Sequence, residues 1–193
     1  MYSQSEEEKY ILLALQDQCS GQFLDIGAFD AKVFSNTRGL YELGWSGVVI
    51  EQSPGPLRGL VKEYSEYPKE SRVKVLSCAI GLERGLREIR VTDDAVSGNE
   101  QARWDEQGGF YGELYVQFLT IHDIISQFGA FQMVNIDVEG SSVDLMIELF
   151  KTQMDPRCVV VEHDNRLVEL LTAAQQKGYR PVYTSAENVV LVR

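Results

Sequence analysis

The chain has 193 residues, 44% of them hydrophobic and 24% charged, and its 18 basic against 29 acidic residues give a net charge of −11. This composition predicts one globular domain with a sizeable core, and the acidic excess disfavours general nucleic-acid binding, which depends on Lys and Arg. The apolar runs are too short to cross a bilayer, so we expect no membrane association. An odd number of cysteines without a signal peptide is typical of a reducing environment, which predicts a cytoplasmic protein.

Strand patterns alternate with helix patterns over the first 80 residues. A predicted helix at 5–18 has glutamates near its start, where they complement the helix dipole. The elements that follow are a strand at 22–26, a helix at 34–43 capped by Ser35 or Asn36, a strand at 47–51, a helix at 54–65 and a strand at 73–80. This alternation predicts parallel strands joined by helical crossovers.

The segment after residue 81 interrupts this alternation. A strand is predicted at 86–91, and a polar, glycine-containing stretch at 92–113 follows it. Loops of this length without secondary structure are uncommon and usually functional, so we interpret 92–113 as a lid or substrate loop. A surface excursion with no role in binding is the alternative.

The alternating pattern resumes in the second half and ends in a pair of strands. Its elements are an extended segment at 114–119, a helix at 121–128 capped by Thr120, a strand at 131–138, a helix to 151 capped by Ser141 or Ser142, a strand at 158–162, a helix at 165–177, and strands at 180–184 and 189–192. Together the elements predict an α/β fold: a mostly parallel sheet with helices on both faces and a C-terminal antiparallel hairpin.

The ends of the first two strands carry the clearest binding signal. The first strand enters a tight turn at Gly27, and the second ends in Glu51. Ligands bind at the carboxyl ends of parallel strands, and an acid after the second strand is placed to accept hydrogen bonds from a ribose. A dinucleotide needs a glycine-rich turn, whereas one glycine flanked by Asp25 and Asp30 favours a cationic nucleoside such as S-adenosylmethionine. A turn that binds no ligand is the alternative.

Acidic side chains also end the later parallel strands. Asp137 and Glu139 follow one of them, and Glu162 and His163 end the next. Clustered acids repel each other unless a cation lies among them, and either the sulfonium cofactor or Mg²⁺ would serve. His163 is a candidate general base. Alternatively, the acids cap helices and His163 is a packed, hydrogen-bonded histidine.

Several stretches resemble one family, the FkbM-type methyltransferases. They extend over nearly the whole chain and include Leu24-Asp-Ile-Gly-Ala28, Phe34-Ser-Asn-Thr-Arg38, Gly44-Trp-Ser-Gly47, Val49-Ile-Glu51, Asn135-Ile-Asp-Val-Glu-Gly140 and Val161-Glu-His163. The resemblance implies a Rossmann-like class I methyltransferase with a seven-stranded sheet and S-adenosylmethionine as cofactor. Members commonly methylate hydroxyls of sugars, polyketides or other small metabolites, which implies a small-molecule or glycan acceptor here.

The resemblance also implies roles for individual residues. The cofactor would contact Asp25, Gly27, Ala28, Asn36, Glu51, Gln52, Cys78, Ala79 and Asp137. Within this set Asp25 and Gly27 would border the methionine end, Glu51 would hold the ribose, and Cys78 and Ala79 would flank the adenine. Asp137 and Glu139 would face the acceptor, and together with His163, the candidate general base, they are the predicted catalytic residues. Related sugar O-methyltransferases bind magnesium at the acids ending these strands, which implies Asp137, Glu162 and His163 as metal ligands, although His163 stands where a carboxylate would be expected.

Two further functions stay open at the level of the sequence. One is a nicotinamide-dependent oxidoreductase, which the single-glycine turn and the lack of a Tyr-x-x-x-Lys pair disfavour. The other is a nucleoside-cofactor-binding module without catalysis, against which the acids at the strand ends argue. The leading prediction is O-methylation of a hydroxyl on a small metabolite, sugar or glycan. The sequence identifies neither the acceptor nor the oligomeric state.

Overall fold

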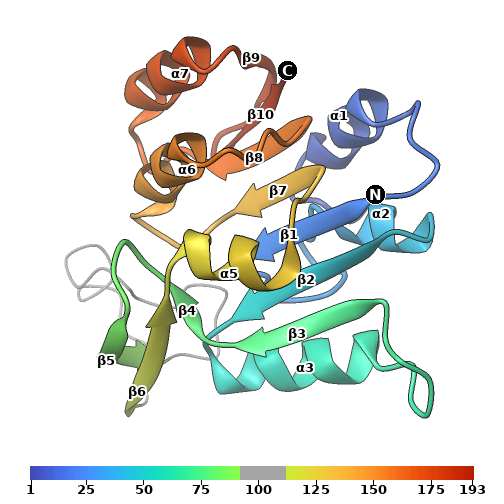
Figure 1. The fold of residues 1–193 in the computed structure, drawn as a ribbon, viewed down its shortest axis with the longest axis vertical. Coiled ribbons are helices and arrows are strands. Elements are labelled where there is room, and N and C mark those ends of the chain that lie inside the picture. The colour runs from blue at the N-terminus through green and yellow to red at the C-terminus, as the bar shows by residue number, and fades with distance from the viewer. Residues whose placement is uncertain (92–111) are drawn as a thin grey trace.

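A computed structural model describes residues 1–91 and 112–193 and has a seven-stranded sheet at its centre (Figure 1). The strands of this sheet are β1 (Gln22–Ile26), β2 (Ser46–Glu51), β3 (Val73–Ser77), β7 (Met133–Ile136), β8 (Cys158–Glu162), β9 (Arg180–Thr184) and β10 (Asn188–Val192). Their order is β3-β2-β1-β7-β8-β10-β9, and β10 alone runs in the direction opposite to the other strands of this sheet. The predicted Rossmann-like sheet and its C-terminal antiparallel hairpin are confirmed.

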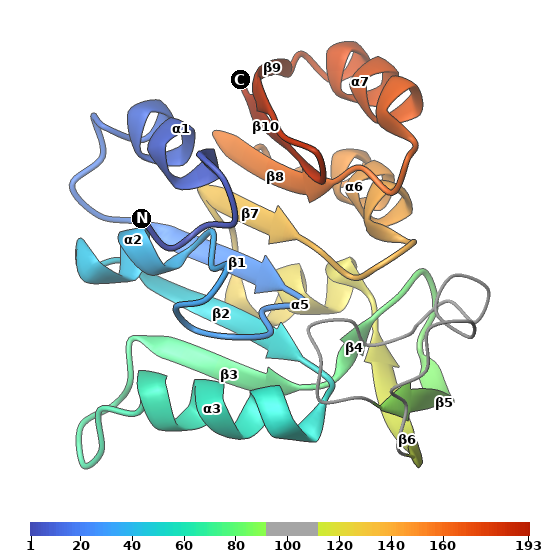
Figure 2. The ribbon, with the colours of Figure 1, turned by 180° about the vertical axis from the view of Figure 1, so that it is seen from behind.

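Helices cover both faces of this sheet (Figures 1 and 2). They are α1 (Glu7–Ala14), α2 (Arg38–Glu42), α3 (Pro54–Tyr64), α5 (Ile121–Phe128), α6 (Ser142–Lys151) and α7 (Leu167–Gln176). One core lies between the sheet and α5, α6 and α7, and a second core lies between the opposite face and α1, α2 and α3. The strands therefore have apolar side chains on both faces, as expected for a buried parallel sheet. Among the residues that the structure describes, no helix is both long and apolar enough for a membrane span.

A second, three-stranded sheet corrects one sequence prediction. The predicted strand 73–80 is divided, because β3 ends at Ser77 and β4 (Ala79–Ile80) belongs to the second sheet. There β4 pairs with β6 (Gly112–Leu119), which pairs antiparallel with β5 (Gly85–Val91). Figure 1 shows this sheet beside the carboxyl ends of β2 and β3. Of the predicted lid at 92–113, residues 92–111 lie outside the described part, and 112–113 begin β6.

The segment between β1 and α2 corrects a second prediction. The helix predicted over 34–43 begins only at Arg38. Phe34 has a φ of 60°, a left-handed conformation that a helix does not contain, and Ser35 Oγ accepts the N–H of Arg38 at 3.1 Å. The non-helical residues before Arg38 are thus available to form one wall of the site described below.

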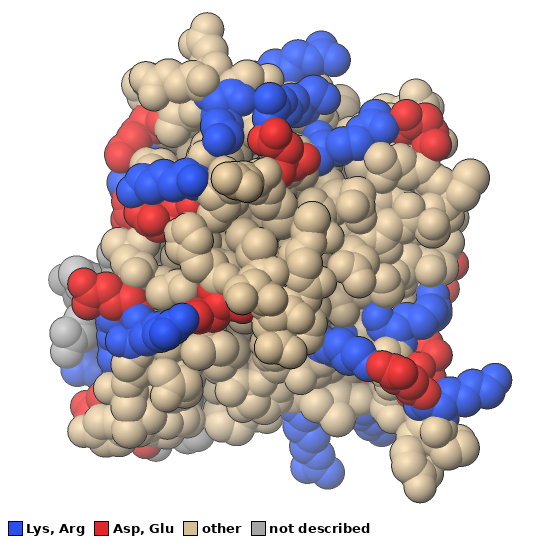
Figure 3. Space-filling view, in the orientation of Figure 1, with Lys and Arg blue, Asp and Glu red and all other residues tan. Residues whose placement is uncertain are grey.

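The sheet order determines where a ligand can bind. β1 lies between β2 and β7, and from β1 the chain first builds the sheet toward β3 and later returns to build it toward β8. The crevice at such a reversal, outside the carboxyl ends of the strands, is the usual ligand site of open α/β sheets. On the face seen in Figure 1, acidic and basic side chains are interspersed around an uncharged middle (Figure 3), so the acidic excess does not gather on that face.

Candidate active site

A cavity of about 270 Å³ lies at the carboxyl ends of the central strands. Six of its lining residues are acids, namely Asp25, Glu51, Asp137, Glu139, Glu162 and Glu187. No lysine, arginine or histidine lines it within residues 1–91 and 112–193. Low-dielectric walls that carry charge of one sign concentrate the electric field, so the described walls of this cavity attract cations.

The turn after β1 requires a glycine for a reason internal to the fold. Gly27 has a φ of 81°, and its N–H and that of Ala28 both donate to the carbonyl of Ile50, at 3.0 and 3.1 Å. A Cβ atom on Gly27 would lie 1.7 Å from the carbonyl oxygen of Asp137. The close approach at this glycine is therefore between two backbone segments of the chain itself.

Glu51 ends β2 with its carboxylate held by backbone amides. Oε2 accepts the N–H of Phe29 at 3.0 Å, and Oε1 accepts that of Ser53 at 2.7 Å. The residue is only 6% exposed, and this burial raises the pKa of its carboxyl while the amide hydrogen bonds oppose the rise. The two bonds fix the carboxylate at the cavity wall and tie the turn after β1 to the end of β2.

Asp25 holds the central strands together from within the same wall. Its Oδ2 accepts the hydroxyl of Thr37 at 2.6 Å, and its Oδ1 accepts Nδ2 of Asn135 at 2.8 Å. Burial raises the pKa of the Asp25 carboxyl, and these two hydrogen bonds counteract it. Because Asn135 lies on β7 and Thr37 precedes α2, Asp25 positions both the cavity wall and the neighbouring strand.

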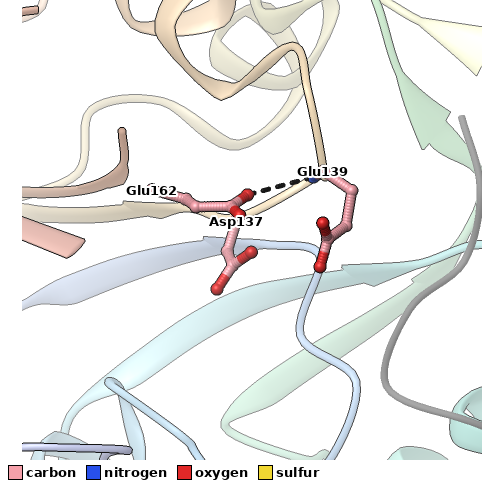
Figure 4. Close-up of side chains that lie close together, drawn as sticks. All are labelled: Asp137, Glu139 and Glu162. Carbon is pink, nitrogen blue, oxygen red and sulfur yellow. Dashed lines mark hydrogen bonds between the residues drawn. The ribbon is translucent and has the colours of Figure 1, made fainter. Parts of the chain in front are cut away.

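Three carboxylates meet at the rim beyond β7 and β8. Single oxygens of Asp137, Glu139 and Glu162 all lie within 4.8 Å of one another (Figure 4). Glu162 Oε2 also accepts the backbone N–H of Glu139 at 3.2 Å and the hydroxyl of Ser142 at 3.4 Å. Burial raises the pKa of both Asp137 and Glu162, and the nearby charge of Glu139 raises both further, while the hydrogen bond between Asp137 and Glu162 opposes the rise at Asp137. The fold thus holds together groups that resist being ionised at the same time.

His163 is not brought together with Asp137 and Glu162. Its Nδ1 accepts the N–H of Asn165 at 3.3 Å, and its ring belongs neither to the cavity lining nor to the carboxylate cluster. The third member of the cluster with Asp137 and Glu162 is Glu139. The next residue, Asp164, accepts the N–H groups of Gly140 and Ser142 at 2.6 and 3.0 Å and so holds the start of α6.

The remaining predicted cofactor residues line the cavity. They are Ala28, Asn36, Gln52, Cys78 and Ala79. Sequence reasoning missed Gln4, Phe29, Val33, Phe34 and Glu187, which also line it. Gln4 precedes α1 and had no sequence signal, whereas Glu187 lies in the β9–β10 turn, and its carbonyl accepts the N–H of His163 at 2.8 Å. The position of β10 next to β8 would have been needed to predict that contact.

Comparisons with known proteins establish the fold. No protein-family model matches the chain, and no curated protein sequence is significantly similar to it.

The structure is similar to that of methyltransferase FkbM from Methylobacillus flagellatus KT, with a TM-score of 0.55 and 16% identity, over 90% of this chain but only 43% of the other. It is also similar to a fibrillarin pre-rRNA processing protein from Methanococcus jannaschii, with a TM-score of 0.50, 9% identity, and coverage of 97% and 75% of the two chains. M. jannaschii TYW2, solved in complex with AdoMet, matches with a TM-score of 0.44, 14% identity, and coverage of 99% and 75%. At these identities the likeness concerns the fold alone, and the chain spans less than half the length of the FkbM structure.

Proposed function

We propose that this protein is an S-adenosylmethionine-dependent methyltransferase that methylates a hydroxyl on a small metabolite, sugar or glycan. The observation that carries the proposal is the cavity beside β1, where the described lining residues include six acids and no basic residue. Such walls favour a ligand with positive charge, which the sulfonium and ammonium groups of this cofactor provide. They repel the pyrophosphate of a nicotinamide cofactor, and the likeness in fold to the FkbM structure supports the same choice.

The side chains around the cavity fit the parts of this cofactor. Glu51 is held by the backbone N–H groups of Phe29 and Ser53, and since a carboxylate oxygen can accept more than one hydrogen bond, it can also accept one from a ribose hydroxyl. Cys78 and Ala79 offer apolar surface for the adenine. Asp25 and Gly27 also line the cavity, and we assign to them the methionine part of the cofactor. Each part of the cofactor thus has a matching part of the wall.

Asp137 and Glu139 are the residues we propose for the chemistry. The bound cofactor supplies a methyl group on a positively charged sulfur. Asp137 and Glu139 orient the acceptor hydroxyl, and a carboxylate oxygen of one of them takes its proton while the acceptor oxygen bonds to the methyl carbon and the carbon–sulfur bond breaks. Holding the acceptor in line contributes about 7–11 kcal/mol to lowering the barrier. His163 has no part in this scheme, because it does not line the cavity.

Mg²⁺ stays a separate prediction. Asp137, Glu139 and Glu162 offer carboxylate oxygens, the ligand type that Mg²⁺ prefers, within 4.8 Å of one another. An ion held there would supply a Lewis acid to the acceptor oxygen. We therefore propose these three carboxylates, without His163, as the metal ligands to be tested.

Calorimetric titration tests the cofactor. Purified protein is titrated with S-adenosylhomocysteine and, separately, with NADH, each with and without Mg²⁺. One-to-one binding of S-adenosylhomocysteine alone supports the proposal, and tighter binding in Mg²⁺ supports the metal site. Binding of NADH alone, or of neither ligand, overturns the proposal.

Transfer of a labelled methyl group tests the chemistry. A panel of sugars and other hydroxyl compounds is incubated with methyl-labelled cofactor and the protein. Asp137→Ala should lower turnover about 10²- to 10⁴-fold, the usual contribution of a positioned proton acceptor. Asp155→Ala is the matched control, since Asp155 is an exposed acid paired with Arg193 and does not line the cavity. Equal turnover of the two variants would remove Asp137 from the mechanism.

A further inference from the structure

A chain of hydrogen bonds links the buried Asp25 to Asn36 at the cavity wall. Asn135 Nδ2 donates to Asp25 Oδ1 over 2.8 Å, and Asn36 Nδ2 donates to Asn135 Oδ1 over 3.0 Å. The three side chains are 3%, 4% and 5% exposed, so water does not compete strongly for these bonds. Asp25 and Asn135 are also register partners on neighbouring strands, which keeps the chain of bonds aligned.

The carboxylate at one end of this chain sets the direction of every bond in it. A carboxylate only accepts hydrogen bonds, so Asn135 must turn its NH₂ group to Asp25 and its oxygen to Asn36. Asn36 must then turn its own NH₂ group to Asn135. Its Oδ1 has no hydrogen-bond partner within the part of the chain that the structure describes, and it is closed to bulk water. Buried acceptors are nearly always paired in native proteins, so this oxygen calls for a donor from a ligand.

The sheet order indicates which part of a ligand supplies that donor. Asn36 is bonded to Asn135 on β7, whereas Glu51 ends β2, and β1 separates these two strands. Glu51 is the proposed partner of the ribose, so Asn36 lies beside the other end of the cofactor. That end carries an α-ammonium group with three N–H donors, which is the strongest donor in the molecule.

We propose that Asn36 Oδ1 accepts a hydrogen bond from the α-ammonium of the bound cofactor, and that Asp25 and Asn135 hold the Asn36 amide in the required orientation. The inference rests on the proposed function. Asn36 already lines the cavity, and the terminal torsion of an asparagine has a broad minimum, so its amide can adjust to a ligand there while keeping its bond to Asn135. The site therefore selects S-adenosyl ligands that carry an α-amino group over those that lack it.

Calorimetry with two ligands and three proteins tests this selection. The ligands are S-adenosylhomocysteine and its analogue with hydrogen in place of the α-amino group, and the proteins are the wild type, Asn36→Ala and Asn36→Asp. The wild type should bind the amino ligand about 10- to 100-fold more tightly, the range expected for a hydrogen bond to a charged group. Asn36→Ala should lower this preference about 10-fold or more, and the acidic walls account for any preference that stays. Asn36→Asp keeps an acceptor oxygen but loses the N–H that Asn135 Oδ1 accepts, so it should retain the preference for the amino ligand while binding both ligands more weakly.

The ratio of the two affinities separates this role from a structural one. A variant that merely loosens the cavity weakens both ligands alike and leaves the ratio unchanged. A ratio near one in the wild type overturns the inference without any variant, and so does a ratio that Asn36→Ala leaves intact. Either result with tight binding of S-adenosylhomocysteine leaves the proposed function standing. Failure of the wild type to bind S-adenosylhomocysteine overturns the proposed function and this inference together.

Discussion

The turn at Gly27 offers a stability prediction with a control within the same chain. Gly27 and Gly178 have nearly the same positive φ, 81° and 88°. A Cβ on Gly27 would lie 1.7 Å from the carbonyl oxygen of Asp137, whereas a Cβ on Gly178 would have no atom within 4 Å. Gly178→Ala therefore measures the conformational penalty alone, and Gly27→Ala adds the close contact to it.

The structure sets the expected losses. A left-handed alanine costs about 1–2 kcal/mol, which is the whole effect expected for Gly178→Ala. Carbon and oxygen normally approach to about 3.3 Å, so the ends of β1 and β7 must separate by about 1.6 Å to admit a methyl group on Gly27. Overpacking of this kind costs about 1–3 kcal/mol, and the N–H of Asp137 loses its 2.9 Å bond to Ile26, which contributes about 1 kcal/mol. Gly27→Ala should lose about 3–6 kcal/mol in all.

Urea unfolding followed by circular dichroism measures both losses. The free energy of unfolding in water comes from the midpoint and slope of each transition. Domains of this size are stable by about 5–15 kcal/mol, so a Gly27→Ala protein that is largely unfolded without denaturant agrees with the upper part of the range. Equal losses for Gly27→Ala and Gly178→Ala would refute the argument that Gly27 is required by the crossing of two backbone segments.

Three further predictions test single contacts. Glu51→Ala should weaken binding of S-adenosylhomocysteine about 10- to 100-fold in calorimetry, because bonds to a carboxylate are strong, and an unchanged Kd would contradict the ribose assignment. Thr120→Ala removes the capping box of α5 and should lower the free energy of unfolding by about 0.5–2 kcal/mol in urea; no loss would contradict the cap. Iodoacetamide should alkylate only the exposed Cys19 of the folded protein. Burial raises the pKa of Cys78 to about 11 and that of Cys158 to about 12, so neither thiol forms the reactive thiolate at neutral pH. A second adduct in mass spectrometry would contradict this.

A helix or strand can be predicted from the sequence when its ends are determined by residues next to it in the chain, such as a capping residue. Thr120 was expected to cap a helix at 121–128, and the structure has that helix, with reciprocal hydrogen bonds between Thr120 and Asp123. The apolar run at 73–80 could not be divided in the same way. Its residues fit a single strand, and only the pairing of Ala79 with Phe118, nearly forty residues away, moves its end into the second sheet. The hydrophobic pattern of a segment does not show which distant strand it pairs with.

The candidate site was partly predictable for the same reason. Strand ends could be found from the sequence, and with them Glu51 and Asp137. The side chains just beyond the strands depend on backbone turns that the alternation of a strand does not describe. β7 ends at Ile136, and Glu139 has a φ of 54°, so Asp137 and Glu139 both line the cavity rather than opposite faces. Similar positive φ values follow His163, which does not line the cavity.

The surroundings of the carboxylates at the site separate those with a structural role from those with a functional one. Carboxylates that only hold a fold are placed opposite donors, as Asp164 is opposite the N–H groups of Gly140 and Ser142. Burial and the nearby charge of Glu139 instead raise the pKa of both Asp137 and Glu162, so the folded protein is less stable when both are ionised. Proteins keep such local conflicts mainly where function requires them. Many functions share this fold, so the fold alone says little about activity. The unfavourable burial of Asp137 and Glu162 is the stronger argument for a cation-binding, catalytic role.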